Sequence, residues 1–264
     1  MAALSEEQQM IKDQASAWVR EQAPVSTFRA MRDQDLAQGF FSETWQAMIE
    51  MGWTGLVVPE TYGGAGLGYQ TLGLVLEQLG RNLVASPLYA SSVVGAAALM
   101  HSGSEDQKQA LLPKIADGGR LVVLALEEGP RHNPSQIECR AKLTSSGVTL
   151  SGTKQFVMEG NAATDFVVAA NVDHGAGEQG IGLFLVACDT PGVRRHAVKT
   201  MDSRGYASVT FDDVALDLEA MLAGPDTGQE VLESVLNVAT AALAAEMLGT
   251  AAAAFDMTLD YLKT

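Results

Sequence analysis

The sequence predicts an α+β fold of several domains, in which a helical N-terminal domain precedes an antiparallel β-barrel middle domain and the start of a C-terminal helical bundle. Two changes in hydrophobic period support this prediction. Apolar residues recur at helical spacing up to Gly118 and Gly119, short β-rich runs follow, and the helical spacing returns near Gly228. We therefore expect domains at residues 1–119 and 120–215, followed by one long helix at 226–264.

Two capping boxes predict helix starts in the N-terminal domain. Ser5 with Gln8, and Ser104 with Gln107, have the spacing at which each side chain bonds the other residue's backbone N–H. The first box begins an amphipathic stretch that runs to about residue 22. The second begins a helix that stops at the glycine pair before the middle domain.

Two more helices are expected between these boxes. Ser42 is predicted to cap a helix that ends at Gly52. Ser86 and Pro87 supply an N-cap and a first-turn proline for an Ala-rich helix. The whole segment up to residue 118 is therefore predicted to be helical.

The middle domain is predicted from short β-rich runs separated by Gly, Asn and Asp turns. The runs are Leu121–Leu126, Ile137–Leu143, Val148–Leu150, Gln155–Met158, Phe166–Ala170, Gly182–Ala187 and Ala207–Phe211. Evenly spaced strands without helices between them favour an antiparallel barrel or sandwich.

The C-terminal segment predicts one long helix with an uncovered apolar face. That face carries Val231, Val235, Leu236, Leu243 and Met247. The final residues 262–264 contain no Gly or Pro stop signal, so we expect further helices of a bundle to be missing from this chain. An uncovered face of this kind favours association, so the chain alone is expected neither to stay monomeric nor to be active.

Composition excludes several classes of protein. A net charge of −15 argues against nucleic-acid binding, which needs clustered basic residues. No unbroken apolar run reaches the roughly 18 residues of a membrane span, and the N-terminus lacks signal-peptide features. Cys139 and Cys188 form no paired motif, which favours a reducing, cytoplasmic setting. The four histidines lack metal-ligand spacing, so no metal site is predicted: His101, His132, His174 and His196.

Several segments in their usual order resemble the acyl-CoA dehydrogenase family. The segments are Gly52–Gly64, Glu77–Arg81, Gly103–Lys108, Leu111–Gly118, Leu124–Pro134, Leu150–Gly160, Val209–Val214 and Tyr261–Thr264. The resemblance covers the whole chain. It implies the three-part fold above, with only the first long helix of the C-terminal bundle present.

The resemblance also implies a cofactor and a reaction. Such enzymes hold FAD without a covalent bond between the β-domain and the C-terminal bundle, often with help from a neighbouring subunit. A carboxylate removes the α-proton of an acyl-CoA thioester while the β-hydride passes to the flavin. The reaction needs a positioned base and stabilisation of the developing enolate oxygen.

The family's base is absent from its helix position in this chain. That position falls on Ala239, which cannot accept a proton, and the family's other base position lies beyond Thr264. The next residue, Thr240, corresponds to a position close to the substrate. Glu246 is the only carboxylate between Glu233 and Asp256, and we expect it to be structural rather than a base.

Two segments correspond to flavin contacts in the family. Leu126, Glu127 and Glu128 are expected along the pyrimidine side of the ring. Phe156, Val157 and Met158 replace the family's Trp-Ile-Ser/Thr against the ring. Phe156 keeps an aromatic wall, whereas Met158 lacks the hydroxyl that commonly bonds the flavin.

Basic residues are the candidate substrate contacts. Arg131 and His132 occupy a turn where relatives carry small residues near the thioester or pantetheine, and they could bind a phosphate, block the pocket or be solvated. Arg204, together with Lys199 and the 194–196 run, is a candidate for the CoA phosphates.

The resemblance implies two competing functions. The first is an FAD-dependent acyl-CoA dehydrogenase of lipid or steroid side-chain oxidation, or a subunit of one, with an electron-transfer-flavoprotein-type acceptor. The second is a non-catalytic partner subunit or decayed homologue that keeps the fold in a homo- or hetero-oligomer. Other flavoproteins on this fold, acyl-CoA oxidases and flavin monooxygenases, stay open because fold does not fix reaction.

Overall fold

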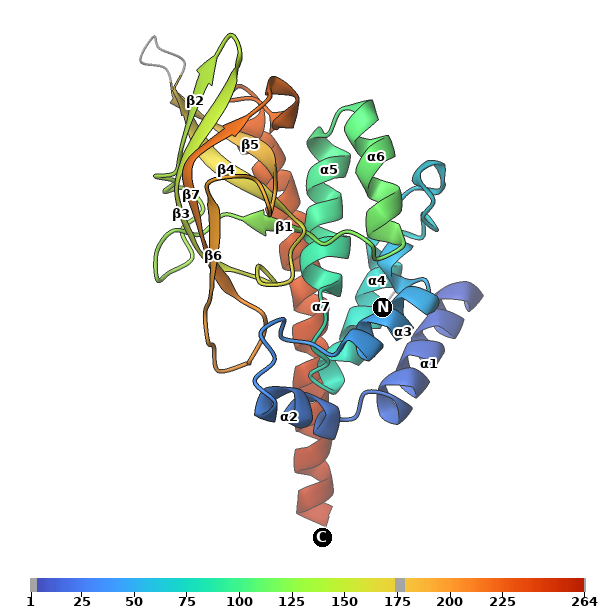
Figure 1. Cartoon of the computed structure of the whole chain (residues 1–264). Coiled ribbons are helices and arrows are strands. Elements are labelled where there is room, and N and C mark those ends of the chain that lie inside the picture. Colours follow the sequence, from blue (N-terminus) through green and yellow to red (C-terminus); the bar gives the residue numbers. More distant parts are fainter. Residues whose placement is uncertain (1–3, 174–178, 264) are drawn as a thin grey trace.

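A layer of helices and an eight-stranded sheet lie side by side in the computed structural model, which describes residues 4–173 and 179–263 (Figure 1). The long helix α7 (Gly228–Lys263) runs along both and continues past them at its C-terminal end. The predicted fold class is confirmed. His174 and Thr264 lie outside the described residues.

The N-terminal part is helical, as predicted. It comprises α1 (Glu6–Glu21), α2 (Val25–Asp33), α3 (Ser42–Glu50), the 3-10 turns η1 (Trp53–Gly55) and η2 (Glu60–Tyr62), α4 (Gly68–Arg81), the π-helix η3 (Leu88–Gly95), α5 (Ala96–Ser102) and α6 (Glu105–Ala116). Both capping boxes form, with reciprocal side-chain bonds at Ser5 and Ser104. These caps satisfy backbone donors that would otherwise be left open at the helix starts.

Two predicted helix starts need correction. Ser42 is the first residue inside α3, and the cap position is the extended residue Phe41, which makes no side-chain cap. The segment after Pro87 begins as the π-helix η3 and becomes α-helical only at Ala96. Helices α2 and α4 had no predicted start of their own, because neither carries a side-chain cap.

The middle part is one mixed sheet. Its strands are β1 (Val122–Ala125), β2 (Arg140–Thr144), β3 (Gly147–Val157), β4 (Asp165–Asp173), β5 (Gln179–Ala187), β6 (Val193–Ala197), β7 (Ala207–Leu216) and β8 (Met221–Ala223), with the turn η4 (Leu218–Ala220) before β8. The strand order is β6-β7-β3-β2-β4-β5-β8, and β1 pairs with β4.

The pairing differs from the purely antiparallel prediction. Strands β1 and β2 both run parallel to β4, and the other pairs are antiparallel. The reason is that β3 turns back from β2 and the chain then crosses to β4, which again runs in the direction of β2. The expected strands 148–150 and 155–158 belong to one strand, β3, whose register shifts twice.

Helix α7 packs on α4 through closely approaching backbones. A Cβ added at Gly249 would lie 1.8 Å from the Glu77 carbonyl oxygen, and one added at Gly80 would lie 2.0 Å from the Glu246 carbonyl oxygen. Thr250 Oγ1 donates to the Gly80 carbonyl oxygen at 3.0 Å. Small residues therefore allow the two helices to touch.

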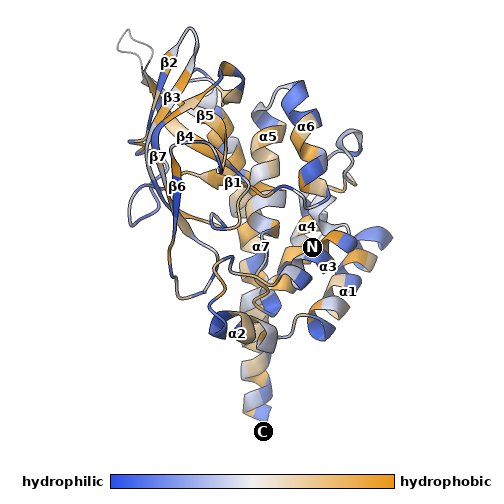
Figure 2. Cartoon of the chain, viewed as in Figure 1, coloured by the Kyte–Doolittle hydropathy of each residue, from blue (hydrophilic) through white to orange (hydrophobic). Residues whose placement is uncertain are grey.

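The apolar face of α7 is covered only in part. Val235 is fully buried by this chain itself, which corrects the expectation that the whole face lies open. Met247 and residues 255, 257, 261 and 262 remain more than 60% exposed. The C-terminal end of α7 projects beyond the other elements and carries apolar residues among polar ones (Figure 2). Among the described residues, α7 is also the one helix long and apolar enough to cross a membrane, by length and composition only.

Candidate functional site

A cavity of about 370 Å³ lies where the helical layer, the sheet and α7 meet. Its walls come from η3, the end of β1 with the loop after it, the end of β3, and one face of α7. The lining residues are Tyr89, Ala90, Val94, Leu124, Leu126, Glu127, His132, Phe156, Val157, Met158, Leu236, Ala239, Thr240 and Leu243. Most of the predicted cofactor and substrate residues therefore surround one space, although they are far apart in the sequence.

Phe156 gives the cavity its aromatic wall. The residue has a left-handed backbone (φ 50°), and the register of β3 against β7 shifts between Lys154 and Val157. The Phe156 side chain is left 43% exposed. A bulky residue in this backbone region is strained, and such strain is concentrated at functional sites.

A buried ion pair fixes the β1 end of the cavity. Lys154 is fully buried, and its Nζ donates to the Leu126 carbonyl oxygen at 3.0 Å and to Glu128 Oε1 at 2.5 Å. Glu128 also accepts from the backbone amides of Glu138 and Cys139 at 2.5 and 3.0 Å. Its carboxylate is therefore occupied in holding the loop. Burial raises the pKa of the Cys139 thiol to about 11, so this cysteine stays protonated.

The role of Lys154 was missed from the sequence. The residue lies in strand β3, and a charged residue on a strand is ordinarily predicted to be exposed to solvent. The available signal was the pair of acidic residues at 127 and 128, which can neutralise a buried lysine only if the two segments meet.

Glu127 and His132 form a pair at the rim of the cavity. His132 Nδ1 lies 2.5 Å from Glu127 Oε1, and the Asn133 amide donates to the other carboxylate oxygen at 3.1 Å. The His132 side chain is 70% exposed. Arg131 and Glu128 instead line a neighbouring loop cleft of about 310 Å³.

Helix α7 offers no free base to the cavity. Ala239 and Thr240 both line it, and the Thr240 hydroxyl donates to the Leu236 carbonyl oxygen at 2.7 Å. Tyr89 faces them from η3 and donates to the Ala239 carbonyl oxygen at 3.1 Å. Burial, and next the negative charge of Glu246, raise the pKa of Tyr89 to about 12, so its hydroxyl stays neutral.

Most of the predicted phosphate-binding cations are already paired within the chain. Arg204 Nη2 donates to Glu246 Oε1 at 2.6 Å, and Lys199 pairs with Asp35. Arg195 Nη1 donates to the carbonyl oxygens of residues 160, 161 and 163. These side chains therefore have structural partners, and contact of Arg204 with a substrate stays a prediction.

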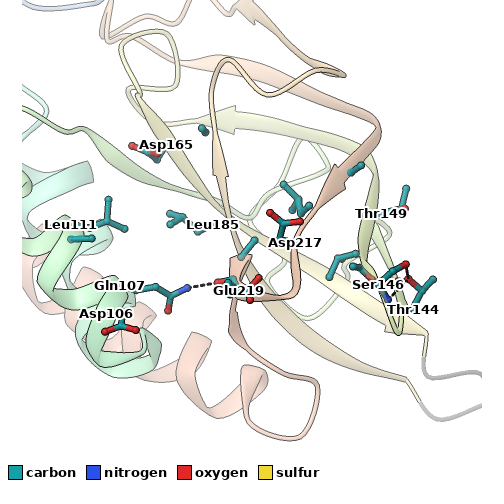
Figure 3. A pocket seen from close by; sticks show the side chains of 17 residues that line it. Asp106, Gln107, Leu111, Thr144, Ser146, Thr149, Asp165, Leu185, Asp217 and Glu219 are labelled. Carbon is teal, nitrogen blue, oxygen red and sulfur yellow. Dashed lines mark hydrogen bonds between the residues drawn. The ribbon is translucent and has the colours of Figure 1, made fainter.

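A larger cleft of about 780 Å³ lies between α6 and the sheet, away from the predicted residues (Figure 3). Asp106, Asp165, Asp217 and Glu219 line it, and Gln107 Nε2 donates to the Glu219 carbonyl oxygen at 2.6 Å. Its acidic lining would repel CoA phosphates. Within residues 4–173 and 179–263, no group of His, Cys, Asp and Glu could hold a metal ion.

Comparisons with known proteins point to one family. A family model described as "Acyl-CoA dehydrogenase, N-terminal domain" matches residues 5–119. A mitochondrial 2-methylacyl-CoA dehydrogenase of Solanum tuberosum is 30% identical over 83% of this chain and 55% of its own length. The chain thus spans little more than half of that curated relative.

Solved structures agree. A variant of the Tcur3481-Tcur3483 steroid ACAD is 32% identical with a TM-score of 0.85, covering 98% of this chain and 67% of that one. The ChsE4-ChsE5 complex from Mycobacterium tuberculosis is 27% identical with a TM-score of 0.87, covering 99% and 68%.

Proposed function

This chain belongs to the acyl-CoA dehydrogenase family, and from that membership we propose that it holds FAD and takes part in the α,β-dehydrogenation of an acyl-CoA thioester. The observation that supports this proposal is the cavity that brings Leu126, Phe156 and Met158 against Ala239 of α7. These are the positions that correspond to flavin and substrate contacts in the family.

The residues present fit a flavin ring. A flavin needs an apolar or aromatic wall and hydrogen bonds to its polar edge. Phe156 and Met158 provide the wall, and the loop from Leu126 to Glu128, fixed by Lys154, lies beside it. When bound, FAD would supply the hydride acceptor. The chain's own residues would shape the space and exclude water from it.

Proton removal needs a group that α7 does not provide at the family position. Ala239 has no proton acceptor, and Glu246, two turns further along, is held by Arg204. We therefore propose that a second acyl-CoA dehydrogenase-like chain completes the site, with an electron-transfer-flavoprotein-type acceptor for the electrons. The exposed apolar residues of α7 support such an association.

The same observations favour a second candidate, a partner subunit without its own chemistry. Ala239 and Met158 each lack the functional group that the family position usually carries. In either case we propose a cytoplasmic setting, which the two free cysteines support. The oxidase and monooxygenase alternatives gain no support from the comparisons reported above.

The visible spectrum of the purified protein tests the proposal. We expect a flavin spectrum when the chain is co-purified with a full-length acyl-CoA dehydrogenase-like partner, and bleaching of that spectrum by an acyl-CoA. A flavin spectrum that acyl-CoA does not bleach would favour the second candidate. A complex in which this chain contributes no flavin site would overturn the proposal.

A further inference from the structure

Glu159 is the most unusual ionisable residue in the described structure. It directly follows the cavity residues 156–158, its side chain is fully buried, and neither carboxylate oxygen has a hydrogen-bond partner of normal geometry. Its backbone is left-handed, with φ 54°. A buried carboxylate without partners is strongly unfavourable when charged.

The guanidinium of Arg204 lies near the carboxylates of both Glu246 and Glu159. Arg204 Nη2 lies 2.6 Å from Glu246 Oε1, whereas Arg204 Nη1 is 4.0 Å from Glu159 Oε1. If both carboxylates were ionised, the cluster of Arg204, Glu246 and Glu159 would carry a net negative charge. The close contact already pairs Arg204 with Glu246, so Glu159 is left as the carboxyl that can hold a proton.

The groups that surround Glu159 on balance favour its protonated form. Burial raises the pKa of Glu159 to about 8, opposed first by Arg204 and by the Gly205 amide, and assisted by Asp202 and Glu246. Burial, and next Asp202, also raise the pKa of the neighbouring Tyr206 to about 12, so that hydroxyl is neutral. A Cβ at Gly205 would come within 2.9 Å of Glu159 Oε2, so the pocket has little room around the carboxyl.

The three side chains lie beside two walls of the cavity, and Arg204 comes from the segment before β7. Glu159 is attached to the strand end that carries Phe156 and Met158, and Glu246 lies one turn beyond Leu243 on α7. We propose that Glu159 is a positioning residue that works as a neutral carboxylic acid. In that form it leaves Arg204 bound to Glu246 and so keeps the segment before β7 attached to α7 beside the cavity.

Ionisation of Glu159 should disturb this arrangement. A second negative charge beside Arg204 would compete with Glu246 for the guanidinium and loosen the link between the segment before β7 and α7. The proposal concerns the folded chain alone, so it does not depend on whether the cavity takes a flavin.

Glu159→Gln tests the proposal, because glutamine has nearly the same shape and no charge. We expect the variant to match the wild type in thermal unfolding near about pH 5 and to unfold at increasingly higher temperature than the wild type up to about pH 8. Infrared difference spectra, wild type minus variant, should show a protonated carboxyl band that disappears near the same pH. Glu50→Gln, at an exposed site, should leave the wild-type pH dependence unchanged.

Glu159→Ala supplies the second comparison, because it removes the shape as well as the charge. We expect Glu159→Ala to unfold at lower temperature than Glu159→Gln at every pH. A Glu159→Gln chain that fails to fold, or that is no more stable than Glu159→Ala, would overturn the proposal. So would a wild-type spectrum without a protonated carboxyl band near neutral pH.

Discussion

The contact between α4 and α7 can be tested with one methyl group. In Gly249→Ala, the new Cβ would lie 1.8 Å from the Glu77 carbonyl oxygen and 3.0 Å from the Arg81 backbone nitrogen. Both obstacles are backbone atoms in a helix, so no side-chain rotation can relieve the contact. Helix α7 would have to move away from α4 by roughly 1.5 Å to restore an ordinary separation.

The change in the free energy of unfolding of Gly249→Ala is the sum of opposing contributions. Alanine gains about 1 kcal/mol over glycine in a helix interior. Overpacking of this kind costs about 1–3 kcal/mol, and the displaced Thr250–Gly80 hydrogen bond costs about 1 kcal/mol more. We therefore expect Gly249→Ala to lower the free energy of unfolding by about 1–3 kcal/mol.

Gly73→Ala is the matched control, because it lies on α4 and faces the same helix. Its Cβ would be 3.6 Å from the Ala245 Cβ, an ordinary contact, so we expect a gain of up to about 1 kcal/mol. Urea unfolding with an unchanged denaturant slope measures both variants. If Gly249→Ala were as stable as Gly73→Ala, α7 would not pack on α4 as described.

Two further predictions concern the cavity walls. Lys154→Met should lower the free energy of unfolding by about 3–5 kcal/mol, because it leaves the Glu128 carboxylate, which is only 11% exposed, without its cation. The double variant with Glu128→Gln should recover part of that loss in urea unfolding, and no recovery would contradict the pairing. Phe156→Asn should leave the free energy of unfolding unchanged or raise it by up to about 1 kcal/mol, because asparagine tolerates a positive φ. The same variant should bind flavin more weakly, as measured by fluorescence. Unchanged binding would mean that Phe156 does not form the wall against the flavin ring.

Local sequence signals predicted much of the fold. The capping boxes at Ser5 and Ser104 formed as expected because a cap depends on residues three positions apart. The switch from helical to strand spacing at residue 119 also reflects local periodicity. Ser42 was misassigned because the chain enters α3 through the extended residue Phe41, which is partly buried against the core, and this is a tertiary effect.

The remaining features depend on contacts between distant segments. The parallel pairing of β1 with β4 joins residues about forty positions apart, and nothing in either strand specifies its direction. The burial of Lys154 and Glu159 likewise could not be read from polar residues in a strand pattern. Family resemblance placed Phe156 and Ala239 near one site, whereas the partners of Arg204 and Glu128 became known only from the structure.

Flavin binding by a cavity-filling variant tests whether the cavity between α7 and Phe156 holds the flavin. Ala239→Trp should fill the space between α7 and Phe156, whereas Ala241→Trp places the same side chain at an exposed position on the same helix. Each variant would be co-purified with the same acyl-CoA dehydrogenase-like partner, and the flavin bound per copy of this chain would be measured by visible absorbance. We expect that the wild type and Ala241→Trp retain the flavin of this chain and that a folded Ala239→Trp loses it. Equal flavin content in wild type and Ala239→Trp would contradict this expectation.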